Sequence, residues 1–302
     1  MSLQEIYSSG KLKVKVKKAY EKYKNCTLCP RRCGVNRLAD ERGECGIGRL
    51  PLISGSGPHR GEEPPLSGRR GSGTIFFSGC NLKCVFCQNY DISNNLRGRA
   101  VDIPRLAEIM LKLEKRGCHN INLVTPSHVI YPILAALYLA ARKDLDLPVV
   151  YNSSGYDSME TLKLMEGAVD IYMPDFKYGS SASGKKYSGV SDYFDIAAPA
   201  IREMYRQVGK LKVDGRGIAQ SGLLIRHLVL PENAARTDKV MKFIGEEISP
   251  NNYINLMRQY YPAFRASEFS ELSRRPRHKE FKRARKAAEE AGITPHQVPE
   301  RN

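Results

Sequence analysis

The stretch that decides the fold is Thr74-Ile-Phe-Phe-Ser-Gly-Cys-Asn-Leu-Lys-Cys-Val-Phe-Cys-Gln-Asn89, an apolar strand followed at once by three cysteines. Beyond it, short apolar runs alternate with longer segments of helical period. We expect strands at Thr74–Ser78, Asn120–Val124, Pro148–Asn152, Asp170–Met173, Leu223–Leu230 and Tyr253–Met257, and helices at Ile103–Arg116, Pro132–Arg142, Ser158–Glu166, Tyr193–Val208 and Ala235–Ile248. This alternation predicts an α/β fold, a partial (β/α)6 barrel with parallel strands and its chemistry at their carboxyl ends.

The composition excludes several classes of protein. The 302 residues include 48 Lys and Arg against 32 Asp and Glu, a formal charge of +16, and are 41% hydrophobic. This is too apolar for a disordered chain. Because no apolar run approaches the length of a membrane span and no signal-peptide pattern opens the chain, we expect a cytoplasmic protein without a membrane partner. Eight cysteines in such a chain indicate metal binding rather than disulfides.

The three cysteines of the opening stretch are candidate metal ligands. Cys80, Cys84 and Cys87 form C-x3-C-x2-C directly after a predicted strand. A structural zinc site would need a fourth ligand, and the next cysteine, Cys118, lies behind a predicted helix. The spacing also differs from both ferredoxin patterns. A [4Fe–4S] cluster held by three thiolates is the other option, because its fourth iron can stay open to an exogenous ligand.

The same residues resemble the signature of the radical S-adenosylmethionine superfamily, C-x3-C-x-aromatic-C, with Phe86 in the aromatic position. The resemblance implies that the open iron binds S-adenosylmethionine. One electron from the cluster, supplied by an external donor, then releases methionine and a 5′-deoxyadenosyl radical that abstracts a substrate hydrogen. The protein positions the cofactor and excludes water.

Through residues 74–262 the chain looks closest to activating enzymes of pyruvate formate-lyase type and their uncharacterised relatives. Asn152-Ser-Ser-Gly-Tyr156 resembles their turn near the cofactor, which implies cofactor contacts for Asn152, Ser154 and Gly155. Pro174-Asp-Phe-Lys177 resembles their Asp-Leu-Lys element, which implies that Asp175 and Lys177 face cofactor and substrate. Arg226-His-Leu-Val-Leu-Pro231 resembles their Arg-x-x-Val-Val-Pro strand, which implies that Arg226 lies on the far wall.

Two departures from the family pattern concern the cofactor. Val124-Thr-Pro-Ser-His128 stands where the superfamily usually has Gly-Gly-Glu, so we expect backbone carbonyls or the hydroxyls of Thr125 or Ser127 to replace that contact. Gln259 and Tyr260 stand where a relative has a histidine.

A second cysteine set precedes the first. Cys26, Cys29, Cys33 and Cys45 form C-x2-C-x3-C-x11-C, a complete four-ligand set for either a zinc ion or an auxiliary [4Fe–4S] cluster. We expect three parts: residues 1–73 as a metal-binding extension and linker, 74–262 as the core, and 263–302 as a basic tail. Within the first part, Pro51–Gly73 is expected to be an irregular linker or a hairpin.

Several other segments have plainer interpretations. Gly179-Ser-Ser-Ala-Ser-Gly-Lys-Lys186 lacks the final Ser or Thr of a phosphate-binding loop and is interpreted as a flexible βα loop. The polar residues His59, Glu62 and Glu63 are expected in an exposed loop. His128 is expected to make a structural hydrogen bond.

Two further residues are expected in the core. His227 is interpreted as a buried histidine with satisfied hydrogen bonds, and Cys118 as a small buried apolar residue.

The basic runs Lys11–Lys24 and Arg274–Lys286 are expected to be solvated helix faces, with a terminal helix near Lys279–Ala291. The charge excess favours an acidic protein partner, and nucleic acid remains a second possibility. Three functions follow: activation of a partner enzyme of glycyl-radical type, radical modification of RNA or a small metabolite, or electron transfer and metal storage without catalysis.

Overall fold

The computed structural model describes residues 2–294 and is built around an open, mostly parallel sheet. Six strands run parallel in the order β2-β4-β5-β6-β8-β9. Their bounds are Ser72–Phe77 (β2), Ile121–Val124 (β4), Val149–Ser153 (β5), Ile171–Pro174 (β6), Ala219–Leu228 (β8) and Tyr253–Met257 (β9). Among residues 2–294 no pairing joins β9 back to the opposite edge, so the barrel is open. The predicted partial barrel is confirmed.

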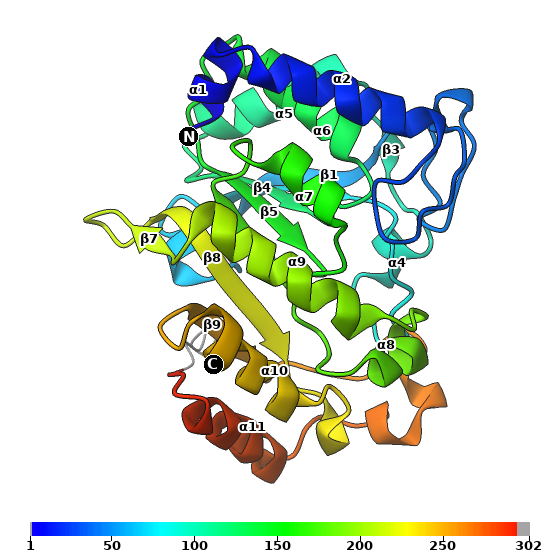
Figure 1. Cartoon of the computed structure of the whole chain (residues 1–302), viewed down its shortest axis with the longest axis vertical. Coiled ribbons are helices and arrows are strands. Elements are labelled where there is room, and N and C mark those ends of the chain that lie inside the picture. Colours follow the sequence, from blue (N-terminus) through cyan, green and yellow to red (C-terminus); the bar gives the residue numbers. More distant parts are fainter. Residues whose placement is uncertain (1, 295–302) are drawn as a thin grey trace.

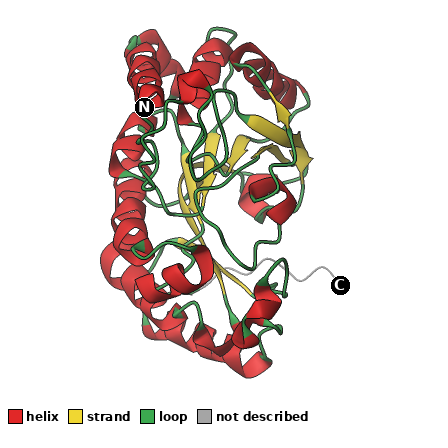
Figure 2. Ribbon diagram, turned by 90° about the vertical axis from the view of Figure 1, so that its right-hand side faces the viewer, coloured by secondary structure: helices red, strands yellow, loops and turns green. Residues whose placement is uncertain are grey.

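Helices between the strands cover the outer face of the sheet (Figures 1 and 2). They are α5 (Ile103–Lys115), α6 (Ile130–Ala141), α7 (Met159–Met165), α9 (Tyr193–Val208) and α10 (Thr237–Phe243), the last continuing as a π-helical turn over Ile244–Ile248. The start of α5 shows why they form where the sequence predicts. The Asp102 side chain accepts the Arg105 N–H at 2.8 Å as the N-cap, and Pro104 stands in the first turn.

The two faces of the sheet carry different side chains because neighbours along a strand alternate. Tyr151 and Tyr172 point outward into the main core with the helices, while Val150 and Ile171 point into the barrel. Inside the barrel they pack with Leu66 of α3 (Pro64–Ser67), a short helix that the sequence did not predict. α3 therefore fills the interior of the barrel from one side.

The segment before the core contributes to the same sheet. β1 (Leu52–His59) pairs antiparallel with β2 and carries the two-residue β3 (Arg99–Ala100) on its other edge. The hairpin alternative for Pro51–Gly73 is thus the observed one. Ahead of it, α1 (Leu3–Ser8) and α2 (Lys11–Lys24) lie across α6, with the Leu12 and Tyr23 side chains of α2 buried and its lysines mostly exposed (Figure 1).

The expected flexible loop at Gly179–Lys186 is wrong. Residues Ser181–Ser188 form helix α8, which ends at Gly189 with φ of 67°. Gly184 permits the packing of α8 against α9, because a Cβ at Gly184 would lie 2.4 Å from the Tyr193 Cβ. The remaining short elements are α4 (Tyr90–Ser93), β7 (Lys212–Val213) and 3-10 turns at Arg37–Ala39, Pro231–Asn233, Ala266–Glu268 and Ser270–Leu272.

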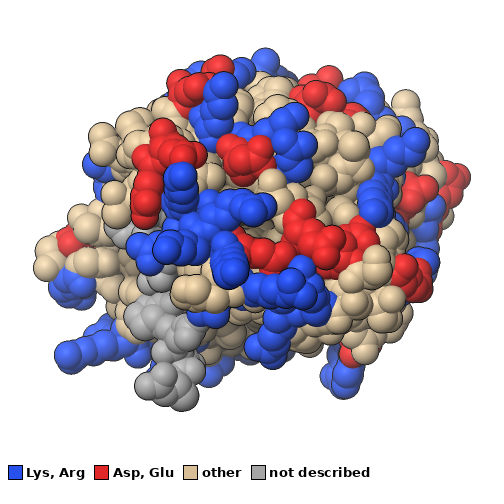
Figure 3. Space-filling view, turned by 90° about the horizontal axis from the view of Figure 1, so that it is seen from below, with Lys and Arg blue, Asp and Glu red and all other residues tan. Residues whose placement is uncertain are grey.

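The basic tail forms helix α11 (His278–Glu290), which packs against α10. Its buried side chains are Phe281, Ala284 and Ala288, so its lysines and arginines face solvent as predicted. Figure 3, seen from below, shows basic and acidic side chains interspersed on that side of the molecule rather than one unbroken basic surface. Within the described residues, no helix is both long and apolar enough to cross a bilayer.

Candidate functional site

The loop after β2 gathers hydrogen-bond donors around its three cysteines. The Ser188 hydroxyl lies 2.9 Å from Cys84 Sγ, and the Ser93 hydroxyl lies 3.1 Å from Cys87 Sγ. The backbone N–H of Leu82 donates to Cys80 Sγ at 3.4 Å. Each sulfur thus lies within hydrogen-bond distance of a hydroxyl or a backbone N–H group.

Two separate segments fix the path of this loop. The Lys83 and Val85 N–H groups donate to the carbonyls of Ser188 and Tyr187, at 3.1 and 2.9 Å. On the other side, the Arg265 N–H donates to the Val85 carbonyl at 2.8 Å. The end of α8, a helix in a segment predicted to be a loop, therefore holds the cysteines in place.

These three cysteines fit an iron–sulfur cluster better than a single ion. Burial raises the pKa of Cys80 to about 12, so a cationic centre is needed to keep its thiolate inside the protein. In residues 2–294 no three His, Cys, Asp or Glu side chains are close enough to share one metal ion. Because each cysteine of a cluster binds a different iron, its sulfurs stand farther apart than around a single zinc.

Asp175 and Lys177 form an ion pair beside the cysteines. Lys177 Nζ lies 2.7 Å from Asp175 Oδ2, and both side chains are largely buried. Burial lowers the pKa of Lys177, but the Asp175 carboxylate and the Cys84 sulfur outweigh this effect. The net result is a raised pKa, so the ammonium stays protonated. Burial raises the pKa of Cys84, and Lys177 offsets part of that rise. The pair places a fixed positive charge next to the thiolates.

Tyr193 of α9 connects this pair to the end of β5. Its hydroxyl lies 2.8 Å from the Ser154 carbonyl oxygen and 3.0 Å from that of Asp175, and it accepts the Lys177 N–H at 2.8 Å. Sequence reasoning missed Tyr193 because it lies inside a predicted helix, where an aromatic side chain is ordinarily part of the core.

The other predicted cofactor residues lie at neighbouring strand ends. Within the described residues, Ser154 Oγ is buried and has no hydrogen-bond partner. Asn152 lies on the strand next to Thr125, and its backbone carbonyl accepts the Thr125 N–H. Gly155 has φ of 75°, and a Cβ there would lie 3.0 Å from the Asp175 carbonyl oxygen. Thr125 has φ of 62°, an unusual conformation for a β-branched residue. Side-chain hydrogen bonds link Ser127 to Asp157 and to Tyr151.

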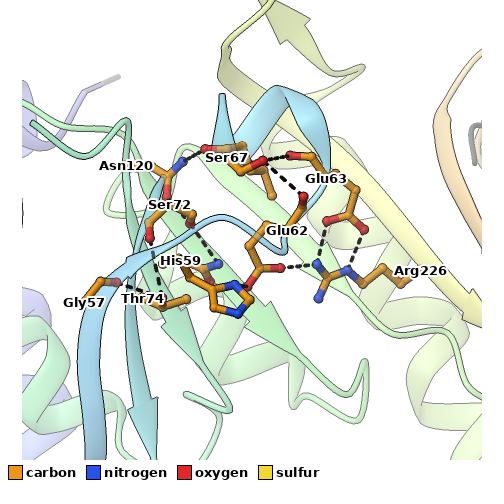
Figure 4. Close-up of polar contacts among 11 residues, drawn as sticks. Gly57, His59, Glu62, Glu63, Ser67, Ser72, Thr74, Asn120 and Arg226 are labelled. Carbon is orange, nitrogen blue, oxygen red and sulfur yellow. Dashed lines mark hydrogen bonds and ion pairs between the residues drawn. The ribbon is translucent and has the colours of Figure 1, made fainter. Parts of the chain in front are cut away.

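The expectation that Glu62 and Glu63 lie in an exposed loop is wrong. Both carboxylates are buried inside the barrel and bind Arg226 of β8 (Figure 4). Arg226 Nε lies 2.7 Å from Glu63 Oε1, and Nη2 contacts both Glu62 and Glu63. Asn255 of β9 adds a hydrogen bond of 2.7 Å to Glu63.

This arrangement fixes the guanidinium of Arg226. Its Nε and Nη2 are bound to carboxylates, and Figure 4 shows the third nitrogen turned away from them. Burial raises the pKa of Glu62, but Arg226 and His59, 3.5 Å away, outweigh it and lower that pKa to about 2. Both carboxylates need a buried cation, and Arg226 supplies it.

Hydrogen bonds between strand side chains continue across the barrel interior. Ser72 donates to Asn120 Oδ1 at 2.6 Å, and Asn122 donates to the Ser72 hydroxyl at 3.1 Å (Figure 4 shows Ser72 and Asn120). The Asn120 amide binds the Leu66 carbonyl at 2.9 Å and so holds α3 in place. Asn122 Oδ1 is buried without a partner.

The plainer predictions for single residues are confirmed. His128 is buried, with Nε2 2.8 Å from the Ser78 carbonyl oxygen, and burial lowers its pKa to about 3. His227 binds the Phe176 carbonyl at 2.6 Å and the Thr237 hydroxyl at 2.8 Å, and burial lowers its pKa to about 4. Cys118 is 3% exposed.

The second cysteine set lies close to the first. Cys26, Cys29 and Cys45 are buried and Cys33 is half-buried. Neither set meets the spacing for a single ion within the described residues. An open parallel barrel with three thiols at the mouth of its first parallel strand defines the class: an iron–sulfur protein with a partial barrel.

Comparison with known proteins assigns the family. The family model "Radical SAM superfamily" matches residues 74–244, more than half of the chain. An uncharacterised protein of Methanocaldococcus jannaschii is 37% identical over 289 residues, which cover 93% of this chain and 79% of the relative. The chain therefore belongs to the radical SAM superfamily, so its core binds a [4Fe–4S] cluster and S-adenosylmethionine for radical chemistry. The predicted superfamily resemblance is confirmed.

One solved structure shows a similar fold at low identity, and a second is more distant. A radical SAM methyltransferase from Sphaerobacter thermophilus has a TM-score of 0.52 at 11% identity, over 74% of this chain and 65% of that one. This chain thus spans slightly less than two thirds of the methyltransferase. A domain of a pyruvate-formate lyase-activating enzyme from Bacteroides vulgatus ATCC 8482 has a TM-score of 0.37 at 11% identity, over 65% of this chain and 91% of that domain.

Proposed function

We propose that this chain is an activating enzyme that abstracts a hydrogen atom from the backbone of a partner protein, in the glycyl-radical manner. Cys80, Cys84 and Cys87 hold the cluster. When bound, the cluster supplies the electron that cleaves S-adenosylmethionine into methionine and a 5′-deoxyadenosyl radical. Asn152, Ser154, Gly155 and the Thr125–Ser127 turn line the cofactor.

The observation that carries the substrate class is the charge inside the barrel. Glu62 and Glu63 share Arg226, Asp175 is paired with Lys177, and His59 lies 3.5 Å from Glu62. When His59 is neutral, three carboxylates against two cations leave an excess of negative charge, which repels a phosphate group in a low-dielectric interior. A peptide backbone is neutral and presents carbonyl oxygens to donors such as the third nitrogen of Arg226. This favours a protein substrate over RNA at the reacting centre.

The chain's own residues then have separate tasks. Lys177 keeps a positive charge beside the thiolates and is itself oriented by Asp175. Tyr193 fixes the backbone at Ser154 and Asp175 together, so the cofactor wall and the ion pair keep one geometry. Glu62 and Glu63 hold Arg226 in one orientation, which reduces the entropy lost when a substrate carbonyl binds.

The test compares two probes under the same conditions. The reconstituted protein is incubated anaerobically with dithionite, S-adenosylmethionine and either a glycine-containing heptapeptide deuterated at the glycine Cα or a single-stranded RNA oligonucleotide. We expect deuterium in the 5′-deoxyadenosine by mass spectrometry with the peptide, and only background cleavage with the RNA. Faster cleavage with RNA, and no deuterium transfer from the peptide, would overturn the proposal.

One alternative keeps support from the same observation. A small metabolite that is neutral or cationic also suits an interior with excess negative charge. This alternative predicts deuterium transfer to 5′-deoxyadenosine from the low-molecular-weight fraction of cells grown in deuterated medium. It predicts no transfer from the protein fraction of the same cells. The opposite distribution supports protein activation.

A further inference from the structure

An arginine of the N-terminal segment is buried without a carboxylate partner. Arg37 is 1% exposed, lies over the Tyr23 ring at 4.2 Å, and donates to the Gly48 carbonyl at 3.0 Å and to the His128 carbonyl. Its remaining nitrogen, Nη2, is buried without a hydrogen-bond partner. No carboxylate within residues 2–294 forms an ion pair with it.

Tyr23 and two cysteines surround this guanidinium. Burial lowers the pKa of Arg37, but the Tyr23 hydroxyl and the Cys45 and Cys26 sulfurs outweigh it and raise that pKa. A buried guanidinium cannot lose its proton, and burying a cation without a counter-ion is costly. Cysteine thiolates that bind a metal centre at this point would supply that counter-ion.

Backbone contacts bring the four cysteines of the segment together. The Cys26 N–H binds the Val35 carbonyl, and the Cys26 carbonyl accepts the Gly34 N–H, both at 3.0 Å, so Cys26 lies beside Cys33. The Glu44 N–H donates to Cys33 Sγ at 3.4 Å, which places Cys33 beside Cys45. The Arg31 N–H is a hydrogen-bond donor to the Cys29 sulfur. Backbone N–H donors to sulfur are typical of iron–sulfur sites.

We propose that Cys26, Cys29, Cys33 and Cys45 hold a second [4Fe–4S] cluster, with Arg37 as its buried counter-ion. Four thiolates leave no open iron, so this cluster does not bind S-adenosylmethionine. A zinc ion with Zn–S bonds of about 2.3 Å would need sulfurs about 3.8 Å apart. No three metal-binding side chains within the described residues are placed to hold a single ion, and this is equally true of the core set, which holds a cluster.

The second cluster packs directly against the loop of the first. A Cβ built on Gly79, the residue before Cys80, would lie 2.5 Å from the Cys45 carbonyl oxygen. Arg31 Nε donates to the Asn81 carbonyl, inside the core cysteine loop, at 2.8 Å. Arg37 binds the His128 carbonyl, and the His128 ring binds the Ser78 carbonyl at 2.8 Å. Two clusters so placed are close enough for their electron spins to interact.

The experiment counts iron and records EPR spectra on the full chain. We expect about eight irons in the wild type, four per cubane, and no stoichiometric zinc. The triple variant Cys80→Ala, Cys84→Ala, Cys87→Ala should keep about four irons and a reduced-cluster signal that S-adenosylmethionine leaves unchanged. The double variant Cys26→Ser, Cys29→Ser should keep the signal that responds. Only the doubly loaded protein should show spin–spin broadening after reduction.

Two controls separate the proposal from misfolding. Cys118→Ser removes a buried cysteine that belongs to neither set, so it should keep about eight irons. Arg37→Met should lower the iron bound by the core triple variant while its circular dichroism stays unchanged. Stoichiometric zinc in the wild type, or a folded core triple variant without iron, would overturn the proposal. Neither result depends on a substrate, so both are independent of the proposed function.

Discussion

Replacing Arg226 by methionine tests whether the barrel interior depends on one buried cation. Glu62 and Glu63 have side chains 7% and 1% exposed, and Arg226 is their shared partner. The folded pKa of Glu62 is about 2 against an ordinary value of 4.5, and at about 1.36 kcal/mol per pKa unit this corresponds to about 3 kcal/mol of stability. Removing one partner from a buried ion pair costs about 3–5 kcal/mol, so both routes agree.

The pH dependence gives the prediction a sign. A carboxyl whose pKa is lowered on folding stabilises the protein above its unfolded pKa, and this stability is lost as the pH falls from about 4.5 toward 2. Without Arg226, burial raises the pKa of Glu62 instead. The variant should therefore recover part of its deficit when the pH drops from neutral to about 5, because protonation relieves the unpaired charge.

Urea denaturation of the reconstituted protein, followed anaerobically by circular dichroism, measures both effects. The matched control is Arg105→Met, since the Arg105 side chain is 54% exposed and its partner Glu108 is 51% exposed. That variant should lose less than about 1 kcal/mol. If Arg226→Met loses no more than Arg105→Met at neutral pH, or falls further behind the wild type on acidification, the reasoning about the buried carboxylates is refuted.

Three further predictions concern single side chains. Cys84→Ala should lose the core irons and form no 5′-deoxyadenosine, whereas Cys118→Ala should keep the irons and form the product. An iron assay and chromatography measure the two properties, and equal behaviour of the two variants would contradict the assignment of the site. Lys177→Gln should lower the rate of 5′-deoxyadenosine formation by about tenfold to a hundredfold, the loss of one charge-assisted contact, and an unchanged rate would remove Lys177 from the site. His227, with its pKa lowered to about 4, stabilises the fold above its unfolded pKa of about 6.5 and loses that contribution as the pH falls. His227→Gln should therefore show a shallower loss of stability than the wild type between pH of about 6.5 and 4.5 in urea titrations; identical slopes would contradict this.

The parallel strands were predictable because their signal is local. Each is a short apolar run bounded by polar or turn residues, and each observed strand lies within a few residues of its expected place. The same holds for the cysteine loop, since its resemblance to the radical SAM signature lies within eight consecutive residues. Neither prediction needs information from distant parts of the chain.

The burial of Glu62 and Glu63, which the sequence did not predict, depends on residues far away in the chain. Glu63 lies in a stretch rich in glycine and proline, and its partner Arg226 is 163 positions away, so no local pattern reveals their ion pair. Helix α8 was missed for a similar reason: glycine and serine predict a loop there, whereas contacts of its last residues with the cysteine loop favour the helix. Burial and long-range pairing override local preference at both places.

The strand β1 limits how the protein can be shortened. The family match begins at residue 74, two residues inside β2, yet β1 and the Glu62–Glu63 acids lie upstream of it. A fragment trimmed to the family match would expose one edge of the sheet along β2 and leave Arg226 buried with no anion. Excision of a minimal catalytic piece should therefore start ahead of Leu52, and grafting this barrel into another chain would have to carry the hairpin with it.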